Sequence, residues 1–315
     1  MNFQRFDLNL LRALDALLSE RNVTRAAERL FVTQQAMSGS LARLREHFSD
    51  ELLVRVGRSL ELTPRGGALV TPVREALLTV EAALLATPYF DPKTSQAEFR
   101  IAMSDYVSFA LLPSLLRHFA EYAPGITCIV EPIDNVSLRK LEYGDLEFCL
   151  APNHWELISE KHLAPEIKSC VLFEEDFVCV VDPGNAAVGD SLTIEQYASL
   201  THNVLGLGSG TESLVERTWR LKGLEPNVSV RAPSFAALIF MIPGSNIITT
   251  AHRRLAEALA PALGLKIVEC PLEIPKLRED LAWHERNALN PFHSFVREAI
   301  REVSSQLGTP HKLQA

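Results

Sequence analysis

The sequence has no uninterrupted apolar run long enough to cross a membrane. Its longest candidate, FAALIFMI from Phe235 to Ile242, is far shorter than the roughly 18 residues that a transmembrane helix needs. The first twenty residues carry charges through their apolar pattern, which is unlike the apolar region of a signal peptide. We therefore expect a cytoplasmic protein without a membrane partner.

Cysteine is scarce, and its five occurrences form no CxxC pair. Structural zinc needs clustered ligands, and a redox sensor needs an exposed thiolate. The sequence also lacks an HExxH motif and any cluster of His, Cys and Asp typical of a catalytic metal. We expect no metal and no cofactor, and we expect the cysteines to be buried small side chains, with a redox-sensing thiol as the minor alternative. The cysteines are Cys128, Cys149, Cys170, Cys179 and Cys270.

Lysine is absent from residues 1–66, where ten arginines stand against eight acidic residues. This region therefore has a net charge of +2, whereas the whole chain has −8. The amino-terminal region is the only part whose charge suits a polyanion such as DNA, and charge alone is a weak indication.

Helical spacing of apolar residues predicts three helices in this region. Asn22 or Thr24 is placed to cap the second helix, and Thr33 is placed to cap the third. The third helix then has an apolar stripe for packing on the other two. The stripe consists of Met37, Leu41, Leu44 and Phe48.

The opposite face of the third helix carries Gln34, Gln35, Ser38 and Gly39. Amides and hydroxyls on such a face can bond base edges in a major groove. Periodicity alone leaves a second interpretation equally open, which is an ordinary three-helix unit whose polar face is only solvated.

A predicted hairpin follows these helices. Residues Leu52–Val56 and Ser59–Leu62 form two short strands around a turn at Gly57, with Arg55 and Arg58 at its tip. A hairpin in this position can act as a wing against the DNA backbone or minor groove.

The run AAERLFVTQQAMSGSLARLREHF, followed by the hairpin and LTPRG, closely resembles the winged helix-turn-helix of LysR-type transcriptional regulators. Gln35 stands where many members have proline or serine, and Gly39 stands where many have a longer polar side chain. The resemblance thus implies binding to double-stranded DNA but does not transfer the sequence that is read. The DNA-binding positions that it implies are Thr33, Gln34, Gln35, Ser38, Arg43, Arg55 and Arg58.

A linker helix is predicted over residues 63–90, with Thr63 as its cap and Pro64 in its first turn. Pro72 favours a kink or a weak first turn. The apolar stripe of this helix needs a partner, either within the chain or, as the resemblance implies, in a second subunit of a homodimer or homotetramer. The stripe consists of Leu69, Val73, Ala76, Leu77, Val80, Ala83 and Leu84.

Beyond residue 97, short apolar strands alternate with helical patterns, which indicates an α/β fold with mainly parallel strands. Two such units resemble the periplasmic-binding-protein fold, which is also the effector domain of LysR-type regulators. We expect subdomain I at about 98–168 and 273–315, and subdomain II at about 169–272. The predicted domains are a winged helix-turn-helix at 1–62, the linker at 63–90 and the effector domain at 91–315.

The segments LLPSLLRHFAEYAPGI, GDLEFCLAP and AWHERNALNPFHSFVREAI resemble the branch that contains nodulation and aromatic-catabolism regulators. That branch implies a small aromatic inducer. Ligands of α/β folds bind at the carboxyl ends of strands. Among the candidates there, Ser104 and Asp105 can also be plain helix caps, His202 a satisfied or surface imidazole, and Phe109 and Phe235 plain core residues. The predicted effector residues are Ser104, Asp105, Tyr106, Phe109, Pro132, Asn153, Thr201, His202, Phe235 and Thr249.

Enzymatic motifs are weak or absent. LGLGSGTES resembles a phosphate loop, but Thr211 breaks GxGxxG and the GxSxG spacing is absent, so a turn or a wall of the effector pocket fits better. We therefore expect a DNA-binding regulator switched by a small molecule, not an enzyme, with RNA polymerase as a further partner. A solute-binding module and an α/β enzyme are the alternatives.

Overall fold

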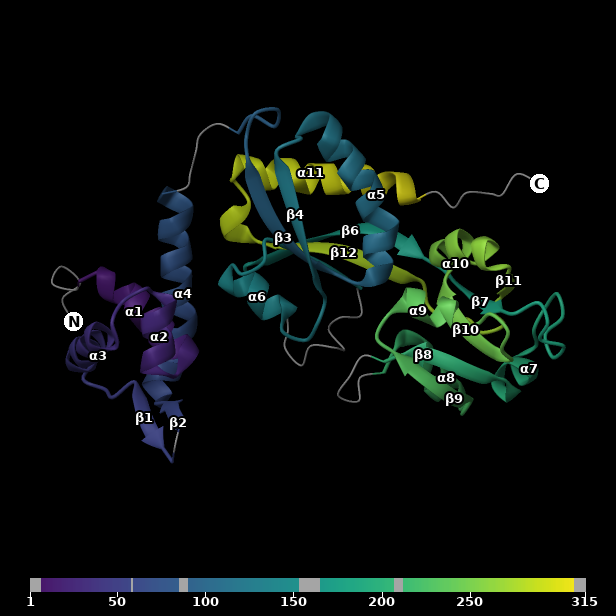
Figure 1. The fold of residues 1–315 in the computed structure, drawn as a ribbon, viewed down its shortest axis with the longest axis horizontal. Helices are drawn as coiled ribbons and strands as arrows, with labels where there is room; N and C mark the ends of the chain where they lie inside the picture. Colours follow the sequence, from purple (N-terminus) through teal and green to yellow (C-terminus); the bar gives the residue numbers. More distant parts are fainter. Residues whose placement is uncertain (1–6, 58, 85–89, 153–164, 207–211, 309–315) are drawn as a thin grey trace. The chain divides into compact units, whose positions relative to one another are not determined.

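A computed structural model describes residues 7–57, 59–84, 90–152, 165–206 and 212–308 of the chain. The chain divides into two compact units, unit 1 from Met1 to Thr87 and unit 2 from Pro88 to Ala315. Figure 1 gives the labels of the helices and strands of both units.

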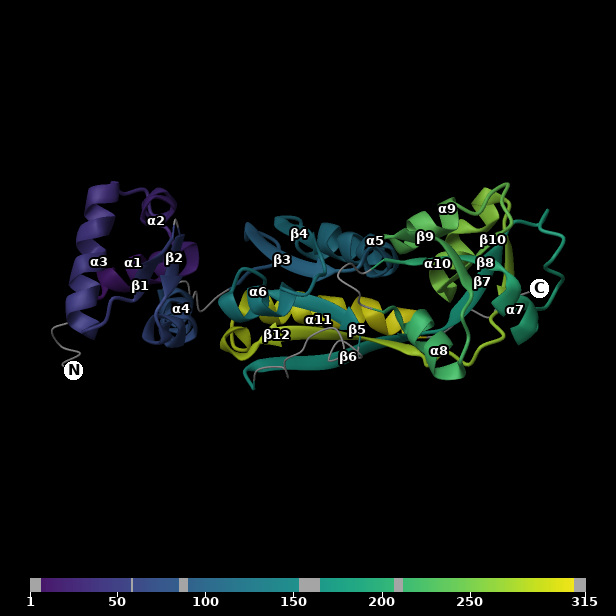
Figure 2. The same ribbon diagram turned by 90° about the horizontal axis from the view of Figure 1, so that it is seen from below.

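Unit 1 begins with three helices, α1 (Asn9–Glu20), α2 (Val23–Arg29) and α3 (Gln34–Phe48). The Asn22 side chain accepts hydrogen bonds from the backbone of α2, and the Thr33 hydroxyl accepts one from that of α3. Asn22 is therefore the cap of α2, and the predicted cap of α3 is confirmed. Figure 2 shows the three helices from a second direction. Their buried core includes Leu14, Leu17, Ala26, Met37, Leu41 and Leu44.

The predicted hairpin is present, as strands β1 (Leu53–Val56) and β2 (Ser59–Leu62) in an antiparallel pair. Gly57 has φ +62° in the turn, a conformation that glycine adopts without steric cost. The linker helix α4 (Pro64–Leu84) follows, and it is continuous through Pro72.

The first part of α4 packs within unit 1. Val73 is 5% exposed and belongs to the same hydrophobic core as the buried residues of α1. Leu69 and Leu77 are partly buried and pack against this core. The Asp15 carboxylate of α1 accepts from Arg74 of α4 at 2.9 Å and from Arg29 of α2 at 3.3 Å. The apolar stripe of the linker thus has a partner inside the chain for its first turns, whereas Val80 is 52% exposed.

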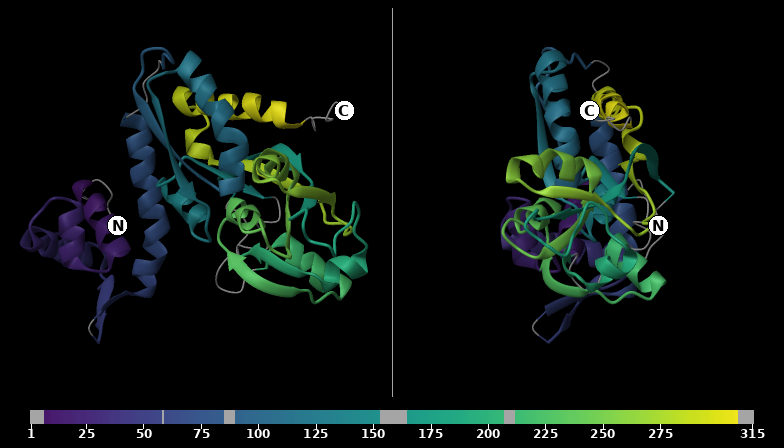
Figure 3. Two further views of the ribbon diagram at one scale, coloured as in Figure 1. Left: turned by 45° about the vertical axis from the view of Figure 1, so that its right-hand side comes forward. Right: turned by 90° about the vertical axis from the view of Figure 1, so that its right-hand side faces the viewer.

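Unit 2 contains two five-stranded sheets (Figure 3). Sheet I has the order β4-β3-β5-β12-β6, in which β4, β3 and β5 are parallel and β12 is antiparallel to β5 and β6. Its strands are β3 (Ala97–Met103), β4 (Ile126–Pro132), β5 (Phe148–Pro152), β6 (Ile167–Glu175) and β12 (Leu277–His284). Its helices are α5 (Asp105–Tyr122), α6 (Ser137–Tyr143) and α11 (Pro291–Ser305).

Sheet II has the order β11-β7-β10-β8-β9, in which β8, β9 and β10 are parallel and β7 is antiparallel to β10 and β11. Its strands are β7 (Phe177–Val181), β8 (Thr201–Leu205), β9 (Asn227–Ala232), β10 (Ile247–His252) and β11 (Lys266–Glu269). Its helices are α7 (Ile194–Ser199), α8 (Leu214–Lys222), α9 (Phe235–Phe240) and α10 (Arg253–Leu259). Among the described residues, short 3₁₀ segments span Pro261–Leu263, Glu285–Asn287 and Gln306–Gly308.

The boundary that the sequence predicts near residue 169 is wrong. Strand β6 pairs with β12 along its whole length and therefore belongs to sheet I. The first strand of sheet II is β7, and the chain crosses between the sheets at Asp176. Three acidic residues, Glu174 to Asp176, interrupt the apolar pattern at the crossing, but no glycine or proline marks a turn there, so periodicity alone did not locate it. The predicted fold class itself, a winged helix-turn-helix with a two-subdomain α/β region, is confirmed.

Candidate functional site

The first candidate site is the exposed face of α3. Gln34, Gln35 and Ser38 are exposed, whereas Met37 and Leu41 on the other side of the helix are 1% and 7% exposed. Thr33 uses its hydroxyl to accept from the Ala36 amide at 3.2 Å. The structure therefore brings the predicted amides and hydroxyl together on one solvent-facing surface.

Two arginines of α3 have different surroundings. Arg43 is exposed and lies 3.6 Å from the Asp7 carboxylate. Arg45 donates to the backbone carbonyls of Glu51 at 2.9 Å and Leu53 at 2.7 Å, so its guanidinium ties the end of α3 to the start of the hairpin. No motif reveals this positioning role in the sequence, because both acceptors are backbone atoms.

The hairpin presents Arg55 at its tip, where the side chain is exposed and its Nε donates to the Gly57 carbonyl at 3.3 Å. Arg58 lies outside the described residues. Of the two hairpin positions predicted to contact DNA, Arg55 is thus the one whose surroundings the structure describes.

The second candidate site lies where the carboxyl ends of strands from both sheets meet. Ser104 follows β3 and caps α5, accepting from the Val107 amide at 3.1 Å. The Asp105 carboxylate accepts from the Ser234 hydroxyl at 2.7 Å and from the Ala236 amide at 3.0 Å. Because Ser234 follows β9, Asp105 joins the carboxyl edge of sheet I to that of sheet II.

Aromatic rings gather beside this junction. Tyr106 is fully buried and stacks on His252, the last residue of β10, with 3.9 Å between ring centroids. Phe235 lies against both, with centroid distances of 6.4 Å to Tyr106 and 4.3 Å to His252. Phe109, one turn beyond Tyr106 on α5, is 41% exposed. Pro132 ends β4 and is exposed.

A buried ion pair crosses the same junction. Glu175, at the carboxyl end of β6, is 3% exposed and binds Arg254 of α10 at 2.6 Å. The Tyr106 hydroxyl donates to the same carboxylate oxygen. Burial, together with the Glu175 charge, raises the pKa of the Tyr106 phenol, so the hydroxyl keeps its proton. Tyr106, Glu175 and Arg254 form what we name the junction network.

Three of the predicted effector positions are not brought to this junction. Thr201 and His202 are the first two residues of β8 and lie at its amino end. Because β8 and β9 are parallel, this end is opposite to the carboxyl edge of sheet II, where Ser234 follows β9. His202 is fully buried, its Nε2 lies 2.8 Å from the Tyr197 carbonyl, and burial lowers its pKa. Thr249 lies within β10 and is also fully buried. Asn153 lies outside the described residues.

One residue at the junction was missed by the sequence analysis. Glu279 of β12 is in register with Pro152 at the carboxyl end of β5, and it is 2% exposed. Its Oε2 atom has no hydrogen-bond partner among the described residues. Burial, followed by the charges of Asp280 and Glu175, raises the pKa of Glu279 to about 8. In the sequence Glu279 stands between Arg278 and Asp280, so no local signal distinguishes it from an exposed charged residue.

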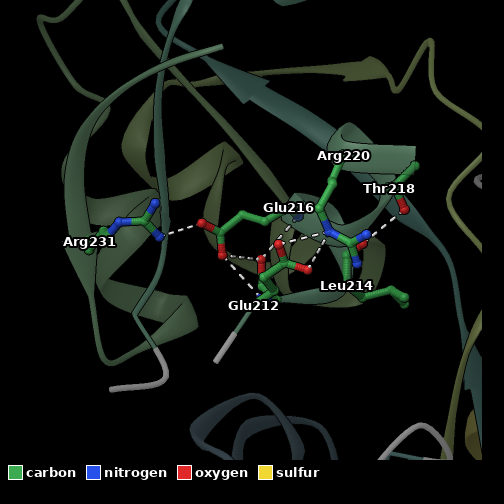
Figure 4. Close-up of polar contacts among 7 residues, drawn as sticks. Glu212, Leu214, Glu216, Thr218, Arg220 and Arg231 are labelled. Carbon is green, nitrogen blue, oxygen red and sulfur yellow. Dashed lines mark hydrogen bonds and ion pairs between the residues drawn. The ribbon is translucent and has the colours of Figure 1, made fainter. Parts of the chain in front are cut away.

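The glycine-rich segment after β8 leads into α8, and Figure 4 shows the contacts around the start of this helix. The Ser213 hydroxyl accepts from the Glu216 amide at 3.2 Å, and Glu216 also pairs with Arg231 of β9. Arg220 pairs with Glu212 at 3.0 Å. The helix start thus already holds a carboxylate, which disfavours a phosphate there.

Cys149 and Cys179 are buried, and Cys128, Cys170 and Cys270 are partly buried. Over the described part of the chain, no three His, Cys, Asp or Glu side chains lie together as metal ligands would. A search of the same residues finds no helix with the length and apolarity of a membrane span.

Comparisons with known proteins match both units. The profile of the bacterial regulatory helix-turn-helix protein, lysR family, matches residues 8–67, and that of the LysR substrate binding domain matches residues 92–305. Nodulation protein D 2 of Rhizobium tropici is 34% identical over 311 residues, which are 98% of this chain and 96% of that protein.

Solved structures agree with these matches. The crystal structure of a probable transcriptional regulator from Pseudomonas aeruginosa is 30% identical, with a TM-score of 0.63 over 95% of this chain and 97% of that chain. Full-length CbnR in complex with its target DNA is 18% identical and shares the fold, with a TM-score of 0.58 over 95% of this chain and 100% of that chain. The chain belongs to the LysR family of transcriptional regulators, with a DNA-binding helix-turn-helix and an effector-binding domain.

Proposed function

We propose that this regulator reads DNA with the exposed face of α3 and holds the backbone with arginines. The observation that carries the proposal is the surface formed by Gln34, Gln35 and Ser38, which are exposed on the solvent-facing side of a capped helix. Amide and hydroxyl groups so arranged suit the donor and acceptor pattern of a major groove. Thr33 and Arg43 would extend the contact surface, and Arg55 and Arg58 would hold phosphates from the hairpin.

We further propose that the domains are a winged helix-turn-helix at 1–62, a linker at 63–90 and an effector domain at 91–315. The linker would pair two copies of the chain, since Val80 is left exposed on its second half. A homodimer or homotetramer of this kind would bind repeated half-sites. The protein would act in the cytoplasm, where the DNA is, and it would signal to RNA polymerase.

Replacing Ser38 by alanine should weaken binding to the specific DNA site by roughly 1 to 3 kcal/mol, because one base-edge contact is lost. Binding to random DNA should change little. Fluorescence anisotropy with the upstream region of the protein's own gene and with a random duplex measures both affinities. Ser40→Ala is the matched control, because the Ser40 hydroxyl donates its hydrogen bond to the Ala36 carbonyl of the same helix at 3.1 Å. Equal losses on the two duplexes would reassign Ser38 to a phosphate.

For the effector, we propose a small aromatic molecule at the junction of the carboxyl edges, where Tyr106, Phe109 and Phe235 gather. Ser104 and Asp105 would provide polar contacts, with Pro132 and Asn153 beside them. The carboxylates of Asp105 and Glu175 lie at the junction beside Glu279, whose raised pKa keeps it protonated near neutral pH, and Arg254 is already paired with Glu175. A neutral phenol therefore fits better than a carboxylate, because like charges repel where water is excluded. We do not carry Thr201, His202 and Thr249 into this proposal.

Calorimetry of the full-length protein should detect binding of phenols at least tenfold tighter than that of the matching benzoates. Phe109→Ala should weaken phenol binding by about 1 to 2 kcal/mol, because the ligand loses its contact with the Phe109 ring. The ring is partly exposed, so its removal should not disturb the core. Thr201→Val, at the far edge of sheet II, is the control and should leave the affinity unchanged. Tighter binding of benzoates, or a Phe109 variant with full affinity, would remove this assignment.

A further inference from the structure

Phe31, in the turn between α2 and α3, is 97% exposed. A phenylalanine normally removes most of its surface from water when a chain folds, because burial of its ring is favourable. This ring gains almost none of that stabilisation in the isolated chain. Val32 beside it is 45% exposed, so the turn presents apolar surface to solvent.

The backbone of Phe31 adds a second, independent observation. Its φ is +55°, in the left-handed region that a bulky side chain rarely adopts. The turn is held there by hydrogen bonds from the Phe31 amide to the Glu28 carbonyl at 3.1 Å and from the Val32 amide to the Ala27 carbonyl at 3.0 Å. Glycine or asparagine would adopt this conformation at lower cost. Neither packing nor backbone geometry in the isolated chain therefore accounts for a phenylalanine at this position.

The place of Phe31 in the chain points to what covers it. Thr33, two residues later, caps α3, and the exposed face with Gln34 and Gln35 begins directly after it. The apolar turn is thus continuous with the surface that faces the major groove in the proposed function. Duplex DNA has apolar surface of its own there, since thymine carries a methyl group and each nucleotide a deoxyribose, and phenylalanine is among the side chains that contact such methyl groups.

We propose that the Phe31 ring packs on apolar surface of the bound duplex and is a specificity-determining contact beside the recognition helix. This inference rests on the proposed DNA binding by α3. It assigns DNA, and not another protein, as the occupant of the exposed turn. The backbone cost at Phe31 is then offset in the complex, where the ring leaves water.

The test compares the full-length protein with Phe31→Asn and Phe31→Tyr on a duplex that the wild-type protein selects from a random pool, and on an unselected duplex. Phe31→Asn should lower the affinity for the selected duplex at least fivefold, because the ring is lost. Its thermal unfolding midpoint should be equal to or higher than that of the wild type, because asparagine tolerates the left-handed backbone. Phe31→Tyr keeps the ring and should bind within about twofold of the wild type.

Two further arms sharpen the result. Replacing each thymine of the selected duplex by deoxyuridine removes one methyl group, and a position that weakens wild-type binding but not Phe31→Asn binding identifies a methyl contact. A loss in Phe31→Asn without such a position identifies deoxyribose. Leu289→Asn, at another exposed apolar residue (94%), is the control and should bind as the wild type does.

An affinity of Phe31→Asn within twofold of the wild type on the selected duplex would overturn the inference. That outcome leaves the proposed function standing. A wild-type protein that selects no duplex from the pool would overturn the proposed function and, with it, this inference. The thermal midpoints separate both outcomes from a folding defect.

Discussion

Replacing Arg254 by methionine should lower the free energy of unfolding of unit 2 by about 3 to 5 kcal/mol. The guanidinium is the cation of the junction network, and without it the Glu175 carboxylate stays 3% exposed and uncompensated. Loss of one partner of a buried ion pair is costly because the remaining charge keeps its desolvation penalty. The variant also loses the hydrogen bonds that Arg254 donates to the backbone carbonyls of Glu174 and Leu307.

Urea unfolding of the full-length protein, followed by far-ultraviolet circular dichroism, measures this change. Arg253→Met is the matched control, since Arg253 is the preceding residue and its partner Glu269 is 76% exposed, so its loss should cost less than about 1 kcal/mol. The double variant Arg254→Met with Glu175→Gln should regain part of the loss. An Arg254 variant as stable as the Arg253 variant would show that the junction network does not stabilise the fold.

Local structure was predictable from local signals. Thr33 caps α3 as predicted, and β2 spans Ser59–Leu62 as predicted, because capping and turn chemistry depend on a few adjacent residues. Strand β1 begins one residue later than predicted. Leu52 has φ +60° and its amide binds the Asp50 carboxylate at 2.7 Å, so it belongs to the preceding turn.

The junction was only partly predictable, because it depends on strand direction and long-range pairing. The sequence analysis located Ser104, Asp105 and Phe235 after strands, and all three lie at the junction. It assigned Thr201 and His202 to the same edge because a polar pair beside an apolar run does not reveal which end of the strand it occupies.

The partners of the junction network are distant in the chain, since Tyr106 and Glu175 are 69 positions apart and Glu175 and Arg254 are 79 positions apart. A single sequence without pairing information contains no periodicity that links such positions. The crossing at Asp176 was missed for a related reason. Strands β6 and β7 are both apolar and nearly adjacent, so only their partners, β12 and β10, distinguish the sheets to which they belong.

A strong pH dependence of stability should come from Glu279. This carboxyl is 2% exposed, and burial together with Asp280 and Glu175 raises its pKa to about 8. In an unfolded chain, the pKa of glutamate is about 4.3. Because the folded value is the higher one, the native state favours the protonated form. Its stabilising effect is complete below about pH 4 and is lost as the pH rises to about 8.

The size of the effect follows from the difference between the two pKa values. One pKa unit corresponds to about 1.4 kcal/mol, so the total loss is on the order of 4 to 5 kcal/mol, of which roughly 2 to 3 kcal/mol falls between pH 6 and pH 9. Glu279→Gln places an uncharged group of the same shape at this position. The variant should lose much less stability over this range and should be the more stable protein at pH 9.

Urea unfolding of the full-length wild type and variant at pH 6, 7, 8 and 9 tests this expectation. Glu302→Gln, on the exposed side of α11, is the control and should keep the pH dependence of the wild type. Parallel curves for the wild type and Glu279→Gln would mean that the Glu279 carboxyl is ionised in the native protein. The junction would then hold a third negative charge, which would repel an anionic effector, whereas the neutral acid does not.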